Sequence, residues 1–502
     1  MKESNHRKLA RRKNRIGARL APRNWQEQPR PMMKGGRLNA EVSDRFRATP
    51  VGGVAVIHRM VQGVGLDRAI NDGCPLLKRH LPYHESDHVL NLAYNVLAGG
   101  TRLEDIDRLR EDESLLDLLG AQRIPDPTTA GDFLRRFNVE SLKRLMNLIN
   151  ATARDRIWCK LPQGSRSRAI IDVDGSLVPT EGEKKRGMDV TYKGIWGYHP
   201  LLVSLANTQE PLFIVNRPGN VTSHDGSAEW LDQAVALCRG GFEEVLLRGD
   251  TDFALTANFD RWTEAGVKFV FGYDANKAVV ALANELPDSA WSVLERTKHE
   301  TPKGAPRQRR ENTKDGIVMD RGFKNQRLLM EWIAEIPYKP GKCRRPYRLV
   351  IVRKDLTVDQ GTQVLFRDIR YFFYIANDER MTAEEVVAHA NQRCHQENLI
   401  EQLKHGIGAL RTPVHDLESN WAYMVIASLA WRLKAWFGVL QPNEEDRVSI
   451  IRMEFRKFLN LIVRVVCQVV CGGRGVHIRL LMYTSHARLL LLDVARLVRA
   501  GP

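Results

Sequence analysis

A series of short, apolar, β-branched segments between residues 166 and 284 constrains the fold more than any other feature of this 502-residue chain. Five segments are predicted strands: RAIIDVD, PLLVSLA, PLFIVN, EVLLRGD and VKFVFGYD. After the third strand, SAEWLDQAVALC is typical of an amphipathic helix capped by Ser227, and a second helix is expected between the last two strands. This order of strands and helices predicts an α/β core.

Helical spacing dominates the chain before this core. HVLNLAYNVLAG and SLLDLLG place apolar residues three and four positions apart, so residues 51–165 are expected to form a helical domain. Residues 1–50 differ, because the first nineteen carry eight Lys or Arg and one Glu, and Gly35 and Gly36 are typical of a linker. We expect a flexible, extended basic arm there, which is either a contact to a DNA backbone or a solvated tail.

A second β-rich region follows the core. Residues 285–380 combine charged, Gly- and Pro-containing stretches with LLMEWIAEI, YRLVIVRK and YFFYIAN, which predicts a mostly β insertion with a basic surface. One continuous helix of more than twenty residues is then expected, because Thr382 and Glu385 form a capping box and Gly406 is a typical end. The region from 441 to 502 is rich in Arg, Leu and Val and fits either a helix or a hairpin.

The charge balance narrows the class of partner. Lys and Arg exceed Asp and Glu by 76 to 60, and this net charge of +16 favours nucleic acid first and an anionic membrane second. No run of about 18 apolar residues occurs, and the basic N-terminus lacks an apolar h-region, so neither a membrane span nor a secretory signal is expected. The seven cysteines form no CxxC pair, which fits reduced thiols in a cytosol.

Aspartates stand at the ends of two predicted strands. Asp172 and Asp174 end the first strand, and side chains two residues apart on a strand project to the same face. Asp250 closes another strand and is followed by Asp252. The carboxyl ends of strands are where α/β sheets bind ligands. Asp is also a common turn and N-cap residue after any strand, so each position alone fits a structural role as well.

The helix expected after residue 381 carries a more specific pattern. Arg393, Glu397 and Lys404 are spaced by four and seven residues, which puts them on one face of a continuous helix. Ile400 and Leu403 lie close to that face, so we expect it to be partly buried. A glutamate flanked by cations on such a face suggests a functional site, although an ordinary surface ion pair has the same spacing.

Three of these segments resemble, in order, the acidic motifs of bacterial insertion-sequence transposases of the DDE type: IDVDGS, LLRGDTDF and NQRCHQENLIEQLK. Arg393, Glu397 and Lys404 reproduce the R, E and K of the Y-(2)-R-(3)-E-(6)-K signature shared by insertion-sequence families 4 and 1380, whereas Ala390 replaces its tyrosine. GDFLRRF, KGIWGYHPLL and RPGN are similar to family 1380 in particular. The resemblance covers roughly residues 50–440.

The resemblance implies an α/β fold class with an RNase H-like catalytic core. The core would comprise residues 166–284 and 381–440, the second part with the glutamate helix, and the β insertion at 285–380 would interrupt it. The helical domain at 51–165 would bind DNA, and residues 441–502 would be a basic C-terminal region.

The resemblance also implies a metal site. Asp174, Asp250 and Glu397 would be the catalytic residues and would bind two Mg²⁺ ions, or Mn²⁺ in their place. Two such ions roughly 3.5–4 Å apart activate a water or 3′-hydroxyl and stabilise the leaving oxygen of an in-line displacement. Arg393 and Lys404 would contact DNA phosphate or steady the glutamate.

Each ligand has a competitor nearby. The alternatives are Asp172 for Asp174, Asp252 for Asp250 and Glu401 for Glu397. The family's acid precedes a small-residue turn, which favours Asp174, and the spacing from the signature Arg and Lys favours Glu397. Glu397 is therefore the best supported of the three ligands and Asp174 the least secure.

Other motifs carry less weight. HESDH at 84–88 matches the zincin pattern HExxH, but Ser86 is expected to cap the helix and to leave His84 outside it, and no third ligand is evident nearby. Gly63-x-Gly65 lacks the third glycine of a dinucleotide site, and no GxxxxGK[ST] loop occurs.

Two tryptophans of the insertion are open to two interpretations. Trp291 and Trp332 either stack on a base splayed from a DNA end, as insertion tryptophans do in related transposases, or pack in the core, which is the more common role.

The function that the resemblance implies is cut-and-paste transposition. A homodimer in a synaptic complex would bind double-stranded DNA at terminal inverted repeats, cleave at the element ends and join the 3′-hydroxyls to target DNA, in the cytoplasm of a bacterium and at its nucleoid. A catalytically inactive, domesticated DNA-binding relative is the nearest rival, and the complete acidic set argues against it. A zinc metalloprotease is a remote rival that predicts bound zinc and no need for Asp174.

Overall fold

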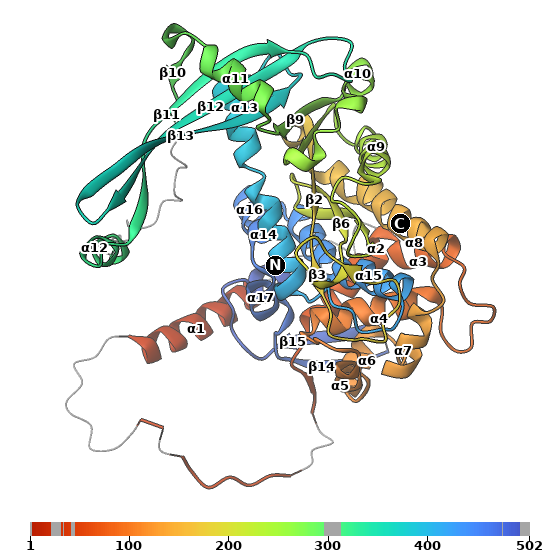
Figure 1. Cartoon of the computed structure of the whole chain (residues 1–502). Coiled ribbons are helices and arrows are strands. Elements are labelled where there is room, and N and C mark those ends of the chain that lie inside the picture. The colour runs from red at the N-terminus through yellow and green to blue at the C-terminus, as the bar shows by residue number, and fades with distance from the viewer. Residues whose placement is uncertain are drawn as a thin grey trace. The chain divides into compact units, whose positions relative to one another are not determined.

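The computed structural model of this chain describes residues 3–21, 32–33, 35–41, 46–295, 313–473 and 475–491. Its contacts divide it into two compact units. The helical unit comprises Met1–Leu161, Gly182–Gly187 and Glu401–Pro502, and the sheet unit comprises Pro162–Glu181 and Met188–Ile400. The many helices and strands confirm the mixed α/β class (Figure 1). The finer division into six domains stays a prediction.

Helices and one small sheet make up the described part of the helical unit. The helices of its first part are α1 (Glu3–Leu20), α2 (Gly53–Val64), α3 (Leu66–Gly73), α4 (Glu85–Leu97), α5 (Ile106–Arg110), α6 (Glu113–Leu119), α7 (Pro127–Leu134) and α8 (Val139–Thr152). Those of its last part are η7 (Gln402–Gly406), α15 (Leu417–Val439), α16 (Glu444–Arg452), α17 (Phe455–Phe458) and η8 (Leu459–Val463). The strands β1 (Arg47–Thr49), β14 (Cys467–Gly472) and β15 (Gly475–Leu480) form an antiparallel sheet. The region after residue 440 therefore contains both helices and a hairpin.

The basic N-terminal segment is folded, which corrects the expectation of an extended arm. Its residues Glu3–Leu20 form α1, none of whose side chains is buried. Several of its residues are good helix formers, and Arg7 pairs with Glu3 one turn away, which offsets part of the repulsion between its cations. The guanidinium of Arg12 donates a 2.7 Å hydrogen bond to the carbonyl of Leu480.

The helix α15 forms the centre of the helical unit. Nearly all of its side chains are buried, because α2, α4, α7, α8 and α16 pack around it. Its two buried cations have polar partners: Arg432 donates to Asn150 Oδ1 at 2.6 Å, and Lys434 donates to the carbonyl of Ile451 at 2.7 Å. None of the described helices, α15 included, has the length and apolarity that a membrane crossing requires.

A nine-stranded sheet organises the sheet unit. Its strands are β2 (Arg168–Gly175), β6 (Leu201–Leu205), β7 (Glu210–Val215), β8 (Glu244–Gly249), β9 (Lys268–Tyr273), β10 (Ser292–Val293), β11 (Lys324–Tyr338), β12 (Tyr347–Gln360) and β13 (Gln363–Ala376). They are ordered β10-β11-β12-β13-β9-β8-β2-β6-β7. The strands β2, β8 and β9 are parallel, and every other neighbouring pair is antiparallel. All eight strands that the sequence predicts are thus present, and β11–β13 are longer than expected (Figure 1).

Short strands and helices complete the sheet unit. The strands β3 (Val178–Pro179), β4 (Asp189–Val190) and β5 (Trp196–Tyr198) form a small second sheet, and the helices are α9 (Ser227–Cys238), α10 (Thr256–Glu264), α11 (Lys277–Glu285) and α12 (Thr313–Asp320), with α13 and α14 described below. Both helices predicted between the core strands are present as α9 and α10. The predicted cap of α9 is wrong, because Gly226 precedes the helix at φ 66° and the hydroxyl of Ser227 donates to the carbonyl of His224 instead.

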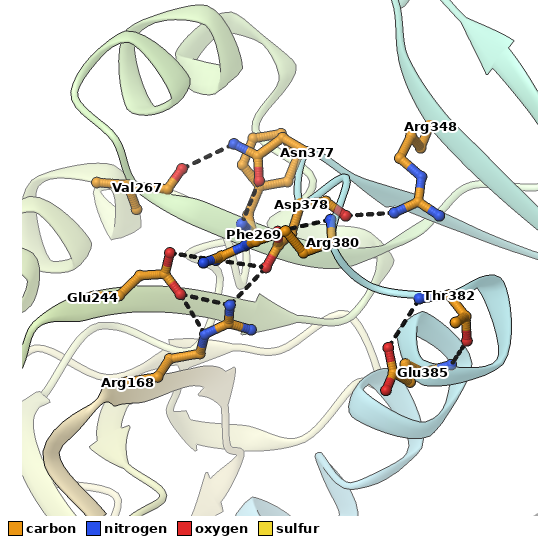
Figure 2. A network of polar contacts seen from close by, with 10 residues as sticks. All are labelled: Arg168, Glu244, Val267, Phe269, Arg348, Asn377, Asp378, Arg380, Thr382 and Glu385. Atoms are coloured by element: carbon orange, nitrogen blue, oxygen red, sulfur yellow. Dashed lines mark hydrogen bonds and ion pairs between the residues drawn. The ribbon is translucent and has the colours of Figure 1, made fainter. Parts of the chain in front are cut away.

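A polar network fixes the point where β13 ends and the next helix begins (Figure 2). The carboxylate of Asp378 is fully buried and accepts hydrogen bonds from Arg168 at 2.7 Å and Arg380 at 3.0 Å. Arg168 also pairs with Glu244 at the start of β8. The side chain of Asn377 bonds the N–H of Phe269 and the carbonyl of Val267, which aligns β9 with the end of β13. The beginnings of β2, β8 and β9 and the end of β13 are therefore held together.

The long helix expected from Thr382 to Gly406 is interrupted, so that expectation is wrong. The capping box of Thr382 and Glu385 is present and begins α13 (Ala383–Asn391). The chain then turns at 392–393, continues as α14 (Cys394–Glu401) and widens into the π-helical η7 (Gln402–Gly406). One face can therefore not be followed along the whole segment by α-helical spacing.

Candidate active site

The two predicted aspartates lie at the same edge of the large sheet. Asp174 is near the end of β2 and Asp250 follows the end of β8, and these strands are parallel neighbours. Each carboxylate is oriented by the backbone: Asp174 Oδ1 accepts the N–H of Gly175 at 2.8 Å, and Asp250 Oδ1 accepts the N–H of Asp252 at 3.0 Å. The strand ends thus hold both acids at a ligand-binding edge.

One guanidinium joins these acids to the predicted glutamate. Arg393 Nη1 donates to Asp174 Oδ2 at 2.9 Å and lies 3.9 Å from Asp250 Oδ2, and its Nη2 lies 3.6 Å from Glu397 Oε1. Arg393 stands in the turn between α13 and α14, and Glu397 stands in the first turn of α14. The three carboxylates, which are far apart in the sequence, therefore gather around a single cation.

Burial makes the two aspartates costly to ionise. Burial raises the pKa of Asp174 to about 6, an effect that the charge of Asp250 increases and that Arg393 opposes. The pKa of Asp250 is also raised, mainly by burial, again against the effect of Arg393. Glu397 differs, because 63% of its side chain is exposed. Two rigid, partly buried acids and one exposed acid thus share the site.

The carboxylate oxygens of these three acids are suitable ligands for a divalent metal ion. Carboxylate oxygens are the ligands that hard cations such as Mg²⁺ prefer, and one or two protein carboxylates suffice where phosphate supplies the rest. The arrangement already attracts a cation, since the guanidinium of Arg393 lies within 4 Å of all three acids. Asp174, Asp250 and Glu397 are therefore candidate ligands of a metal ion.

The competing acids occupy different surroundings. Asp172 is 1% exposed and accepts two hydrogen bonds from Arg248, at 2.7 and 2.8 Å, so its oxygens are occupied inside the fold. Asp252 is exposed on η5 (Thr251–Phe253), and its N–H supports Asp250. Glu401 lies in the helical unit, where it is 3.8 Å from His405.

Two further predicted residues stand on other elements. Lys404 lies in η7 of the helical unit, where the wider winding changes its register relative to α14. Trp332 lies on β11, donates to Asp355 Oδ2 at 3.2 Å and has Arg353 5.4 Å above its ring. Arg353 also lies 5.0 Å from the ring of Trp291, so one cation contacts both tryptophans of the insertion.

Arg248, which is almost fully buried, lies beside the predicted acids and was not predicted from the sequence. It stands in β8, whose residues after Glu244 are all buried and, Arg248 apart, uncharged. A buried arginine requires a partner, so a charged residue inside EVLLRGD was the available signal.

The HESDH segment is corrected in one detail. Its helix α4 begins at Glu85 with His84 as the N-cap residue, which confirms that His84 lies outside, but Ser86 is buried in the first turn and is not the cap. Donor atoms of His80, His84 and Glu85 do lie within 4.8 Å of one another, but this group does not include His88 of the motif. The imidazoles of His80 and His84 are stacked at 4.2 Å and 16°, however, and a metal lies in the plane of each imidazole that binds it. Two nearly parallel rings share no such point, so this geometry disfavours a zinc site.

Comparison with known proteins identifies the family. Residues 42–502 match the family model described as Transposase DDE domain group 1. No curated protein matches the chain. Among solved structures it is similar to the piggyBac transposase synaptic complex with hairpin DNA, at 12% identity over 91% of this chain and 86% of that chain. The TM-score of 0.32 is too low to transfer any residue of that protein. Because the family model spans nearly the whole chain, this protein belongs to the DDE transposase domain group 1 family.

Proposed function

We propose that this transposase cuts and joins DNA at a metal site formed by Asp174, Asp250 and Glu397. The observation that carries the proposal is the convergence of these carboxylates on one guanidinium, from two parallel strand ends and the helix α14. A surface ion pair between Arg393 and Glu397 would explain one of these contacts and leave the two aspartates unexplained.

Two Mg²⁺ or Mn²⁺ ions would supply activation of the attacking oxygen and stabilisation of the leaving 3′-oxygen when bound. The protein's own residues provide the geometry. Asp174 and Asp250 are fixed by the sheet and by backbone N–H groups, whereas the exposed Glu397 can adjust to DNA. Arg393, with its planar fork of donors, is suited to hold the acids in register or to contact a DNA phosphate, and Lys404 would contribute a second phosphate contact.

The fold and the signature support a finer assignment. The strands β7-β6-β2-β8-β9 are antiparallel on one side of β2 and parallel on the other, which supports the RNase H-like core that the motifs imply. The long strands β11–β13 precede α13 and fit the β insertion. The signature supports a bacterial insertion-sequence enzyme of the 1380 group that acts by cut-and-paste, as a dimer on terminal inverted repeats.

Two glutamates on neighbouring turns provide a matched test. A duplex carrying the DNA that flanks the gene is end-labelled and incubated with Mg²⁺ and either the Glu397→Gln or the Glu401→Gln protein. We expect Glu397→Gln to abolish nicking and Glu401→Gln to retain part of it, since Glu397 lies 3.6 Å from the guanidinium of Arg393, whereas Glu401 lies 3.8 Å from His405. Equal activity of the two variants would refute the assignment of the third ligand.

The rival functions give different results in the same experiment. An inactive DNA-binding relative would bind the flanking duplex and leave it intact with either metal. A zinc protease would contain zinc and would tolerate Asp174→Asn, whereas a transposase would lose nicking.

A further inference from the structure

A buried ion pair connects the two strands that end in the acids. Arg248 of β8 and Asp172 of β2 are register partners, and both side chains are 2% exposed or less. The guanidinium donates to both carboxylate oxygens, through Nε and Nη2. Burial raises the pKa of Asp172, and the charge and hydrogen bonds of Arg248 oppose this effect. Because a buried pair is seldom worth more than an apolar contact of the same size, its presence calls for another explanation.

The third nitrogen of the Arg248 guanidinium contacts the backbone of α13. Its Nη1 donates to the carbonyl of His389 at 3.0 Å. In a regular α-helix that carbonyl would accept the N–H of Arg393, four residues on. The N–H of Arg393 instead donates to Ala390 at 3.3 Å, and the N–H of Gln396 donates to Arg393 at 2.8 Å, both three residues back. Arg248 therefore supplies the donor that the helix loses where it breaks.

The break determines which residues reach the acids. It ends α13 and brings Arg393 to Asp174, with Glu397 one turn further on. Gln396, which is buried, donates to the carbonyl of Leu202 on β6 and so fixes the start of α14 on the sheet. The segment that leads into α13 is held by the Asp378 network (Figure 2). Polar contacts to the strands thus hold the chain just before α13 and near its end.

We infer that Arg248 is a positioning residue of the reaction site. Held by Asp172, it binds the free carbonyl of His389 and keeps the chain turned at 392–393, so that Arg393 and Glu397 face Asp174 and Asp250. Without it, the N–H of Arg393 can return to His389, and the helix can continue through the turn. This inference rests on the proposed function of the three carboxylates.

An apolar replacement of the pair separates positioning from folding. Asp172→Asn alone would leave a buried, uncompensated arginine, whereas the double variant Asp172→Val/Arg248→Met removes both charges and keeps most of the volume. We expect its melting temperature and its KM for flanking DNA to stay close to those of the unsubstituted protein. Its kcat for nicking should fall about 100-fold, as a displacement of about 1 Å at a reacting site produces.

A conservative variant tests the positioning role of Arg248 if the double variant does not fold. Arg248→Lys keeps the charge beside Asp172, but its single ammonium nitrogen cannot place donors at the three positions that the nitrogens of the planar fork reach. We expect a kcat between those of the unsubstituted protein and the double variant, at an unchanged melting temperature. The control is Arg344→Met, which removes contacts to Asp260 and Glu264 on α10, away from α13. Full turnover in a folded double variant, or in Arg248→Lys, would overturn the inference.

Titration with Mn²⁺ distinguishes this failure from failure of the proposed function. The full-length protein should bind Mn²⁺ and Asp174→Asn should remove that binding. The double variant should still bind Mn²⁺, because Asp174 and Asp250 remain and the guanidinium of Arg393, which contacts Asp174, is displaced together with Glu397. Mn²⁺ binding that Asp174→Asn leaves intact would refute the metal site itself. Normal Mn²⁺ binding and turnover in the double variant would refute only the role of Arg248.

Discussion

The guanidinium of Arg393 lies where a metal ion must reach the acids, and this gives a quantitative prediction. A cation coordinated by Asp174 and Asp250 has to displace the 2.9 Å contact between Arg393 Nη1 and Asp174 Oδ2. Replacing Arg393 by methionine removes that competitor and keeps a side chain of similar length. We therefore expect Arg393→Met to bind divalent metal more tightly than the unsubstituted protein.

The magnitude follows from the contacts. Arg393 and Asp174 are 19% and 17% exposed, so their ion pair is only partly screened. A hydrogen bond between charged groups contributes about 1.5–3 kcal/mol net, which corresponds to roughly 10- to 100-fold in affinity. The contact to Glu397 adds little, because that side chain is 63% exposed and its distance is 3.6 Å.

Isothermal titration with Mn²⁺ at pH 8 measures the effect. This pH lies well above the pKa of about 6 of Asp174, so proton competition does not mask the change. Arg261→Met is the control, since it removes one positive charge from a surface pair with Asp232 on the same unit. Unchanged or weaker Mn²⁺ binding by Arg393→Met would show that the guanidinium supports the ligands and does not compete with the metal.

The remaining predictions concern pH. Because the pKa of Asp174 is raised, the metal-free folded protein binds more protons than the unfolded chain between about pH 4 and 6. The contribution of this group to folding stability is therefore lost as the pH rises through about 6. Mn²⁺ affinity should correspondingly weaken as the pH falls below about 6, and a flat profile from pH 5 to 8 would contradict this. Asp378 behaves oppositely: burial would raise its pKa, but Arg380 and Arg168 outweigh burial and lower it to about 2. The contribution of Asp378 to folding stability is present above about pH 4 and is lost as the pH falls towards 2. In urea denaturation, Asp378→Asn should therefore be less stable than the unsubstituted protein at pH 7 and nearly equal to it near pH 2.

The strand ends were predictable because they depend on local pattern. Short, largely apolar runs that close on Asp predict β2 and β8, and α/β sheets place ligands at such ends. The alternation of side chains along a strand also predicts that Asp172 and Asp174 lie on the same face, but it does not predict how deeply each side chain is buried. Asp172 lies two residues before Asp174 on β2 and is covered by Arg248, which also contacts α13. Asp174, nearer the end of the strand, stays partly exposed.

The helix break was not predictable from local pattern. Apolar spacing and caps favour one helix from Thr382 onward, and the residues at 392–393 include neither Gly nor Pro. The break coincides with a bond between Arg248 and the carbonyl of His389, which are 141 residues apart. A tertiary contact of this kind overrides propensity and leaves no trace in the segment itself.

The contact between Arg393 and Glu397 was predicted correctly although the helix was not predicted to break. Arg393 and Glu397 are four residues apart across the start of α14, where the winding is α-helical, so they still meet. The seven residues to Lys404 pass into the π-helical η7, and the same arithmetic no longer applies. Ala390, which replaces the signature's tyrosine, packs against the apolar core around Val386 and Val387, and its carbonyl accepts the N–H of Arg393. In this chain position 390 therefore contributes to the turn through its backbone carbonyl, a contact that does not depend on the side chain.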